Sequence, residues 1–133
     1  MGNGLILLDT HVLIWMASEP ARLSTAAHEA ISRARQSTGL AVATITLLEL
    51  ARVAQGGRIV ALGSVEQFVR ESVSYVVLKP MTPEIVAAAV RLPATFPKDP
   101  ADRVIAATAL VEGMPLVTAD QRISRSGLVQ TIW

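Results

Sequence analysis

The side chains with the clearest potential for chemistry are carboxylates. The chain contains only four aspartates. Asp9 and Asp120 each follow a short apolar run, while Asp99 and Asp102 begin the otherwise apolar stretch KDPADRVIAATAL at 98–110. If these carboxylates meet, they repel one another unless a cation lies among them or their pKa values rise. Magnesium or manganese held by a few carboxylates supports phosphoryl transfer, so the pattern predicts a metal site that acts on a phosphodiester.

Each acid also has a purely structural interpretation. Asp99 is a good N-cap for a helix that has Pro100 at its first position, and Asp102 in the first turn favours the helix dipole. Glu49 lies on a narrow polar stripe of an otherwise apolar helix, where it could pair with Arg52 on a solvated edge. The placement of the remaining acids therefore decides between caps and an active site.

Other catalytic schemes find little support in the residue types. There is no cysteine, which excludes disulfides, thiolate metal ligands and cysteine nucleophiles. There is no G-x-S-x-G sequence, and only His11 and His28 are available as histidine bases. We interpret His11 as a packing or cleft-rim residue of a first helical turn and not as a ligand. Any metal would be bound by oxygen, which favours a hard cation.

The elements that must position these acids alternate along the chain. Short apolar strands are expected at 5–8, 40–43, 75–78, within LVTAD at 116–120, and at 128–133. Helices are expected at 10–17, 24–36, 44–55, 64–72, 83–91 and 100–112, the last ending at Gly113. This alternation predicts an α/β fold with a parallel sheet covered on both faces. In such sheets ligands bind beyond the carboxyl ends of the strands, where Asp9 and Asp120 fall.

Composition sets the broader class. With 133 residues, 51% hydrophobic and 17% charged, the chain is expected to form one globular domain over 1–133. No apolar run is long enough to span a bilayer and no signal peptide is evident, so we expect no membrane association and a cytoplasmic location. The net charge is +1, but setting aside Asp9, Glu49, Asp102 and Asp120 leaves +5, supplied mainly by ten arginines. Arginine suits bidentate contact with phosphate.

Five segments taken together resemble one family. LLDTHVLIW, ITLLELA, GRI, KDPADRVIAATAL and PLVTADQRI, in this order and spacing, are similar to PIN-domain ribonucleases, specifically VapC-type toxins of toxin–antitoxin pairs. The resemblance covers essentially the whole chain. It implies a three-layer α/β/α fold, magnesium- or manganese-dependent endonucleolytic cleavage of RNA, homodimers, and inhibition by a VapB-type antitoxin. It places the catalytic and metal-binding acids at Asp9, Glu49, Asp102 and Asp120, with Thr118 as an accessory hydroxyl and Asp99 as an accessory acid.

Three alternatives remain beside this interpretation. A phosphoaspartate enzyme would explain Asp9 after the first strand, but it needs a second aspartate where His11 stands. A non-catalytic interaction module would use the acids only as caps, and an RNA-processing nuclease would share the chemistry without a toxin role. We also expect a small partner to lay an apolar segment against the first helix, which is rich in apolar residues, and to extend a basic side chain toward the acids.

Overall fold

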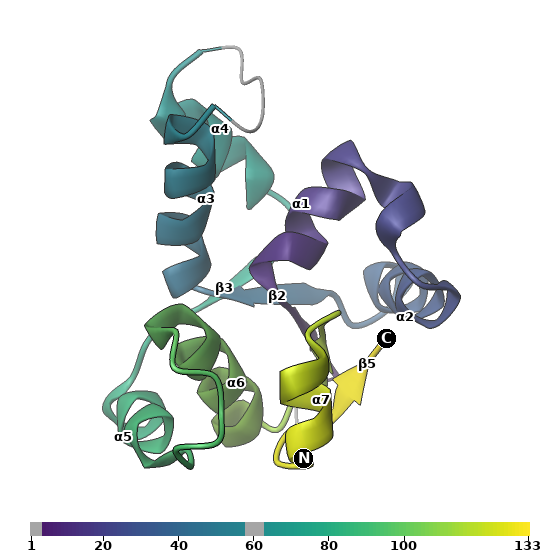
Figure 1. Cartoon of the computed structure of the whole chain (residues 1–133). Coiled ribbons are helices and arrows are strands. Elements are labelled where there is room, and N and C mark those ends of the chain that lie inside the picture. The colour runs from purple at the N-terminus through teal and green to yellow at the C-terminus, as the bar shows by residue number, and fades with distance from the viewer. Residues whose placement is uncertain (1–3, 58–62) are drawn as a thin grey trace.

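The structure is a computed structural model that describes residues 4–57 and 63–133, so Arg58 and Ile59 of the GRI segment lie outside it. Its strands are β1 (Ile6–Leu8), β2 (Leu40–Ala43), β3 (Val77–Lys79), β4 (Leu116–Val117) and β5 (Thr131–Ile132). They form one parallel sheet in the order β3-β2-β1-β4-β5. The predicted parallel α/β sheet is confirmed, and β1 lies at its centre (Figure 1).

Helices cover both faces of this sheet. They are α1 (Thr10–Ser18), α2 (Thr25–Gln36), α3 (Ile45–Gln55), α4 (Val65–Ser72), α5 (Pro83–Arg91), α6 (Pro100–Glu112) and α7 (Gln121–Ser126), with a 3-10 turn at Pro20–Arg22. Figure 1 shows α1 and α2 on one side of the sheet and α5, α6 and α7 on the other, which gives three layers. Among the described residues, none of the helices has the length and apolar character to cross a membrane.

Alternation along β1 explains why both faces are covered. Leu5 and Leu7 point into the core formed with α6 and α7, whereas Ile6 and Leu8 point into the core formed with α1 and α2. Leu7 and Leu8 are completely buried. Burying a leucine side chain contributes roughly 1.5–3 kcal/mol, so a central strand that is apolar on both faces is stable only between two helical layers.

Arg103 fixes α6 against the last turn of α5 and the residues that follow it. Its Nη1 donates to the carbonyl oxygens of Ala89 at 3.1 Å and Leu92 at 3.0 Å, and its Nη2 donates to that of Pro93 at 3.0 Å. Its guanidinium also lies 5.9 Å from the centre of the Phe96 ring. A charged donor that satisfies several carbonyls holds the start of α6, and with it the acids of that helix, in one position.

Local signals located most helix ends. Ser24, Ser64 and Thr82 accept hydrogen bonds from backbone amides as N-caps, and Gly113 ends α6 with a φ of 67°. The sequence prediction lacked α7, a short helix between Asp120 and Gly127 whose only apolar residue is Ile123. A helix of this length has too few apolar positions to show a period.

The two outer strands also differ from the prediction. The strand expected at 75–78 lies at Val77–Lys79, and the one expected at 128–133 is limited to Thr131–Ile132. β3 is at the edge of the sheet, and Val77 and Leu78 are exposed there. The apolar pattern of an exposed edge strand does not mark the core, so it gives no clear boundary.

Candidate active site

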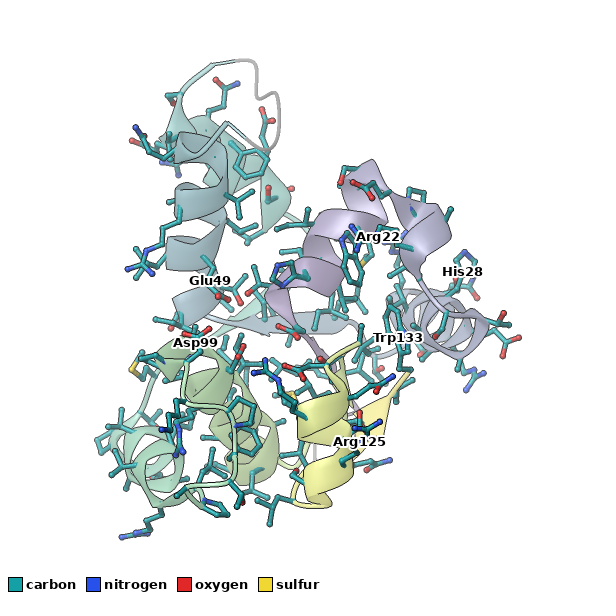
Figure 2. The ribbon with its side chains drawn as sticks, viewed as in Figure 1. Arg22, His28, Glu49, Asp99, Arg125 and Trp133 are labelled. Atoms are coloured by element: carbon teal, nitrogen blue, oxygen red, sulfur yellow. The ribbon has the colours of Figure 1, made fainter. Side chains whose placement is uncertain are left out.

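An acidic pocket of about 490 Å³ opens beyond the carboxyl ends of β1 and β4. Its lining includes Asp9, Glu49, Asp99, Asp102 and Asp120, so all the acids singled out in the sequence lie in one place. Figure 2 shows Glu49 and Asp99 approaching each other from α3 and α6. The edge of the sheet at which ligands were expected is therefore where the acids gather.

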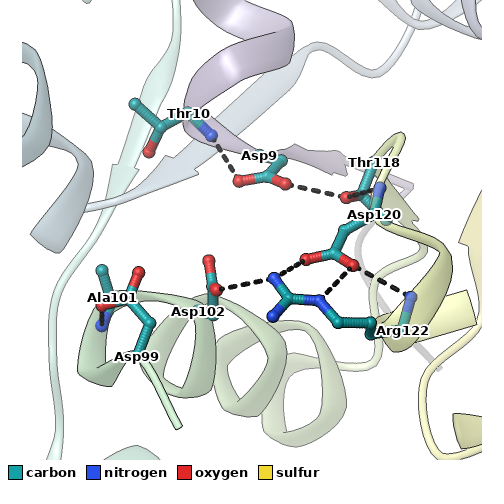
Figure 3. A network of polar contacts seen from close by, with 8 residues as sticks. All are labelled: Asp9, Thr10, Asp99, Ala101, Asp102, Thr118, Asp120 and Arg122. Carbon is teal, nitrogen blue, oxygen red and sulfur yellow. Dashed lines mark hydrogen bonds and ion pairs between the residues drawn. The ribbon is translucent and has the colours of Figure 1, made fainter. Parts of the chain in front are cut away.

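Asp9 is the most buried of these acids, with 8% of its surface exposed. One carboxylate oxygen accepts from the amide of Thr10 at 2.8 Å, which makes Asp9 the N-cap of α1. The other accepts from Oγ1 of Thr118 at 2.7 Å (Figure 3). Burial raises the pKa of Asp9, and the two hydrogen bonds oppose this rise. The turn from β1 into α1 thus holds a carboxylate rigidly at the centre of the sheet edge.

Thr118 connects the ends of the two central strands. Besides donating to Asp9, its Oγ1 accepts from the amide of Asp120 at 3.0 Å. The side chain is completely buried. A single hydroxyl between β4 and α7 therefore contacts two of the acids.

Glu49 reaches the pocket from α3. Oγ1 of Thr10 donates a hydrogen bond to it, and the same hydroxyl lies 2.9 Å from Oγ1 of the buried Thr46. Burial raises the pKa of Glu49, and the charges of Asp9 and Asp99 add to the rise. Within the described residues Glu49 is held by this threonine pair, so the alternative of a solvated pair with Arg52 is wrong.

Asp102 is the acid whose ionised form is strongly disfavoured by its surroundings. Its side chain is 18% exposed on the first turn of α6. Burial is the main cause that raises its pKa to about 7, and the charges of Asp99, Asp9, Asp120 and Glu49 add to it. Asp99, three residues before Asp102, is the N-cap of α6 and accepts a hydrogen bond from the amide of Ala101 at 3.3 Å.

Asp120 differs from the other acids because it already has a cation. Arg122 donates to it from Nε at 3.1 Å and from Nη2 at 2.8 Å, and Arg122 Nη2 lies 3.8 Å from an oxygen of Asp102 (Figure 3). The side-chain hydrogen bond from Arg122 is the main reason why the pKa of Asp120 is lowered. Arg122 was not among the residues predicted for the site, although its position two residues after Asp120 was the available signal.

The cap interpretation accounts for only part of the cluster. Asp9, Asp99 and Asp120 are indeed the N-caps of α1, α6 and α7. Glu49 and Asp102 cap no helix, yet they line the same pocket. Because helix N-termini carry partial positive charge, the ends of α1 and α6 offset some of the repulsion among the carboxylates.

The donor set suits a hard cation, although no ion cage is preassembled. Carboxylates and a threonine hydroxyl offer only oxygen, as magnesium and manganese prefer. Within residues 4–57 and 63–133 no three His, Asp or Glu side chains stand close enough together to enclose an ion. Oxygens of Asp9, Glu49 and Asp120 accept hydrogen bonds from Thr10, Thr118 and Arg122. Magnesium usually keeps several waters and needs only one or two carboxylates, so the residues fit.

Aromatic and basic side chains form the rim of the pocket beside α1. His11, Trp15 and Arg22 line it together with the acids. Their types gave no clear signal in the sequence beyond the rim position expected for His11, because a tryptophan within an apolar helix is ordinarily a core residue.

Comparison with known proteins gives a consistent picture. A family model described as PIN domain matches residues 6–127. Ribonuclease VapC22 of Mycobacterium tuberculosis is 43% identical over 130 residues, which are 96% of this chain and 98% of that protein. Among solved structures, DNA-bound VapBC from Salmonella typhimurium aligns with a TM-score of 0.74 at 19% identity, covering 98% of this chain and 97% of that chain. VapBC2 from Rickettsia felis, bound to a promoter DNA fragment, aligns with a TM-score of 0.73 at 14% identity, covering 96% of each chain.

Proposed function

This chain belongs to the PIN-domain family, and we propose that its acidic pocket is the active site of a metal-dependent endoribonuclease that acts as the toxin of a toxin–antitoxin pair. The observation that carries the proposal is the meeting of Asp9, Glu49, Asp102 and Asp120 in one pocket at the sheet edge. Burial and mutual repulsion raise the pKa of the first three, a state that a bound divalent cation would relieve. The name of the VapC22 relative supports RNA as the substrate. We propose that the protein acts in the cytoplasm, where such a substrate is found.

Asp9 and Asp102 would hold a magnesium or manganese ion, with Glu49 and Asp120 completing the site. When bound, the ion supplies charge stabilisation for the phosphate and lowers the pKa of water. The chain itself fixes Asp9 through Thr118 and the Thr10 amide. Glu49, whose pKa is raised, can take a proton from an attacking water.

The test is cleavage of RNA with and without a chelator. Wild-type protein should cut RNA only when magnesium or manganese is present, and Asp9→Asn should abolish cleavage. Because the buried Asp9 charge is unfavourable without metal, the variant should stay folded, with unchanged or higher stability in urea. Glu29→Gln, which removes an exposed carboxylate on α2 outside the pocket, should cut normally. Full activity of Asp9→Asn at limiting magnesium would contradict the assignment.

The toxin role requires a separate experiment, because an RNA-processing nuclease would show the same chemistry. Expression of the wild-type chain should arrest growth, and expression of Asp9→Asn should not. Co-expression of the product of the adjacent gene should relieve the arrest. Normal growth despite RNA cleavage in vitro would favour the processing enzyme.

An apolar groove between α1, α3 and α4 suits an antitoxin of the VapB type. It is lined by Leu13, Ile14, Ala17, Ser18, Leu50, Phe68, Glu71, Ser72 and Tyr75. Since α1 also carries His11 of the acidic pocket and begins directly after Asp9, a segment lying in the groove has the carboxylates within reach. The similarity of this chain to VapBC structures from Rickettsia felis and Salmonella typhimurium supports such a partner.

We further propose that this partner places a basic side chain among the acids. An arginine or lysine there competes with the metal for the same charge, so inhibition should weaken as magnesium rises. The measurement is inhibition by the co-purified partner across a magnesium series. Complete inhibition that is indifferent to magnesium would contradict the basic side chain and leave only the groove contact.

A homodimer is proposed through exposed apolar residues of α5 and of the segment just before it. Met81, Val86 and Val90 lie together in one shallow depression, and Val90 is 76% exposed. An apolar surface of this kind on a helix is typical of an interface. Val90→Asp should shift the sedimentation of the chain from dimer to monomer, whereas unchanged sedimentation would place the interface elsewhere.

A further inference from the structure

The rim of the acidic pocket carries a cluster of rings and a guanidinium that the cleavage chemistry does not use. The Trp15 ring lies 6.0 Å from His11 and 5.9 Å from Trp133, measured between ring centres. The guanidinium of Arg22 lies 4.3 Å from the centre of the Trp15 ring, a cation–π distance. Figure 2 labels Arg22 and Trp133, the two members contributed by the 3-10 turn and by the end of the chain.

Burial in the core does not explain this cluster. Trp15 is half-buried, His11 is exposed, and Trp133 is 40% exposed. The side chain of Arg22 is 55% exposed, and its guanidinium lies 3.4 Å from the equally exposed Glu19. His11, Trp15 and Arg22 line the same pocket as Asp9 and Glu49, so the cluster continues the acidic site.

Helix geometry sets the separation between the two parts of the pocket. Trp15 is six residues after Asp9, which corresponds to about 9 Å along α1 at 1.5 Å per residue. His11 lies between them in sequence and borders the pocket. The Trp15 ring therefore borders the same pocket as the carboxylates, one to two turns of α1 away from Asp9, where it can receive a nucleotide adjoining the phosphate that the carboxylates bind.

Aromatic rings and arginine planes are the groups on which unpaired RNA bases stack. We propose that Trp15 and Arg22, with His11 on the side toward the acids, form a stacking site for one base of the RNA strand next to the cleaved phosphate. This inference rests on the proposed ribonuclease function. Trp133 is a positioning residue, because it packs against the Trp15 ring. Stacking recognises the face of a base, so the site requires a base at this nucleotide and not one particular base.

The experiment measures binding of a short single-stranded RNA to the full chain by fluorescence anisotropy, with calcium in place of magnesium, so that a divalent ion neutralises the carboxylates while cleavage is avoided. Trp15→Leu should weaken binding about 5- to 150-fold, the range expected for the loss of one base–aromatic stack. Trp15→Phe, which keeps a ring, should remain within a few-fold of wild type, and Arg22→Gln should lose several-fold. Arg35→Gln is the matched control, because Arg35 lies 5.7 Å from the Tyr75 ring and does not line the acidic pocket. It should bind like wild type.

A series of RNAs with one abasic nucleotide at each position in turn keeps the test independent of protein stability. With wild-type protein, one abasic position should weaken binding by about as much as Trp15→Leu, and at that position Trp15→Leu should add no further loss. In the Trp133→Phe variant Trp15 is the only tryptophan. Intact RNA should quench its fluorescence, and the RNA that is abasic at the position identified above should not.

The outcomes separate the two proposals. If wild-type protein cuts RNA and Trp15→Leu binds RNA equally well, the stacking site is wrong and the ribonuclease function stands. The same conclusion follows if the loss of affinity from every abasic position adds to the loss from Trp15→Leu. If Trp15→Leu unfolds, the abasic series with wild-type protein and the Arg22→Gln variant decides. If wild-type protein with metal neither binds nor cuts RNA, the proposed function fails, and the stacking site with it.

Discussion

Replacing Asp102 with asparagine should stabilise the metal-free protein, and the gain should grow with pH. Burial and the neighbouring carboxylates raise the pKa of Asp102 to about 7, from 3.8 for an ordinary aspartate. Well below pH 3.8 the group is protonated in the folded and the unfolded chain, so it contributes no difference. Between pH 3.8 and about 7 it ionises first in the unfolded chain, and well above pH 7 it is ionised in both, so that its charge destabilises the folded chain. Stability of the wild type should therefore fall between these limits, and that of Asp102→Asn should fall less.

The size of the effect follows from the two pKa values. At 1.36 kcal/mol for each pH unit, their difference corresponds to at most about 4 kcal/mol. Solvent screening reduces this, because the side chain of Asp102 is partly exposed. Loss of a negative charge at the first turn of α6 offsets roughly 0.3–1 kcal/mol. We expect Asp102→Asn to be more stable than wild type by about 1–3 kcal/mol at about pH 8, and close to equal at about pH 4.

Urea unfolding with a chelator across this pH range is the measurement. Glu84→Gln is the control, because it removes an exposed carboxylate from the first turn of α5, outside the acidic pocket. It should change stability by no more than about 1 kcal/mol. Adding magnesium should stabilise wild type more than Asp102→Asn, since the ion binds the folded chain. A variant that is less stable than wild type at about pH 8, or whose curve runs parallel to wild type, would refute the account of repulsion among the carboxylates.

Three further changes test other contacts. Asp99→Ala removes the N-cap of α6 and should lower the free energy of unfolding in urea by roughly 0.5–2 kcal/mol, while cleavage is largely retained. Loss of cleavage with unchanged stability would show that Asp99 is the metal ligand and that Asp102 has the structural role. Arg122→Gln frees Asp120 from its internal cation, so calorimetry should show manganese binding several-fold more tightly, and weaker binding would contradict competition between guanidinium and metal. Arg103→Met removes the donor for three backbone carbonyls and should lower stability by about 2–4 kcal/mol, whereas the exposed Arg33→Met should change it by less than about 0.5 kcal/mol.

Much of the fold was predictable because its signals are local. An N-cap, a proline at the first helical position and a glycine with positive φ act within one turn, which is why α6 begins at Pro100 and ends before Gly113 as expected. Runs that are apolar at every position indicated strands covered on both faces, and β1 is such a strand. The shared location of Asp9 and Asp120 followed from a general rule of parallel sheets, in which the carboxyl ends of the strands meet at one edge.

The sequence by itself therefore determined the sheet, its helical layers and the edge at which the acids gather. Only the tertiary structure decided how each acid is held, because that depends on atoms far apart along the chain. Thr118 donates to Asp9 across 109 positions, and Thr10 donates to Glu49 across 39. The contact of Trp15 with the final residue Trp133 is of the same kind. No local pattern encodes such pairings; they form because packing of two layers on one sheet brings these side chains together, and burial there sets their pKa values.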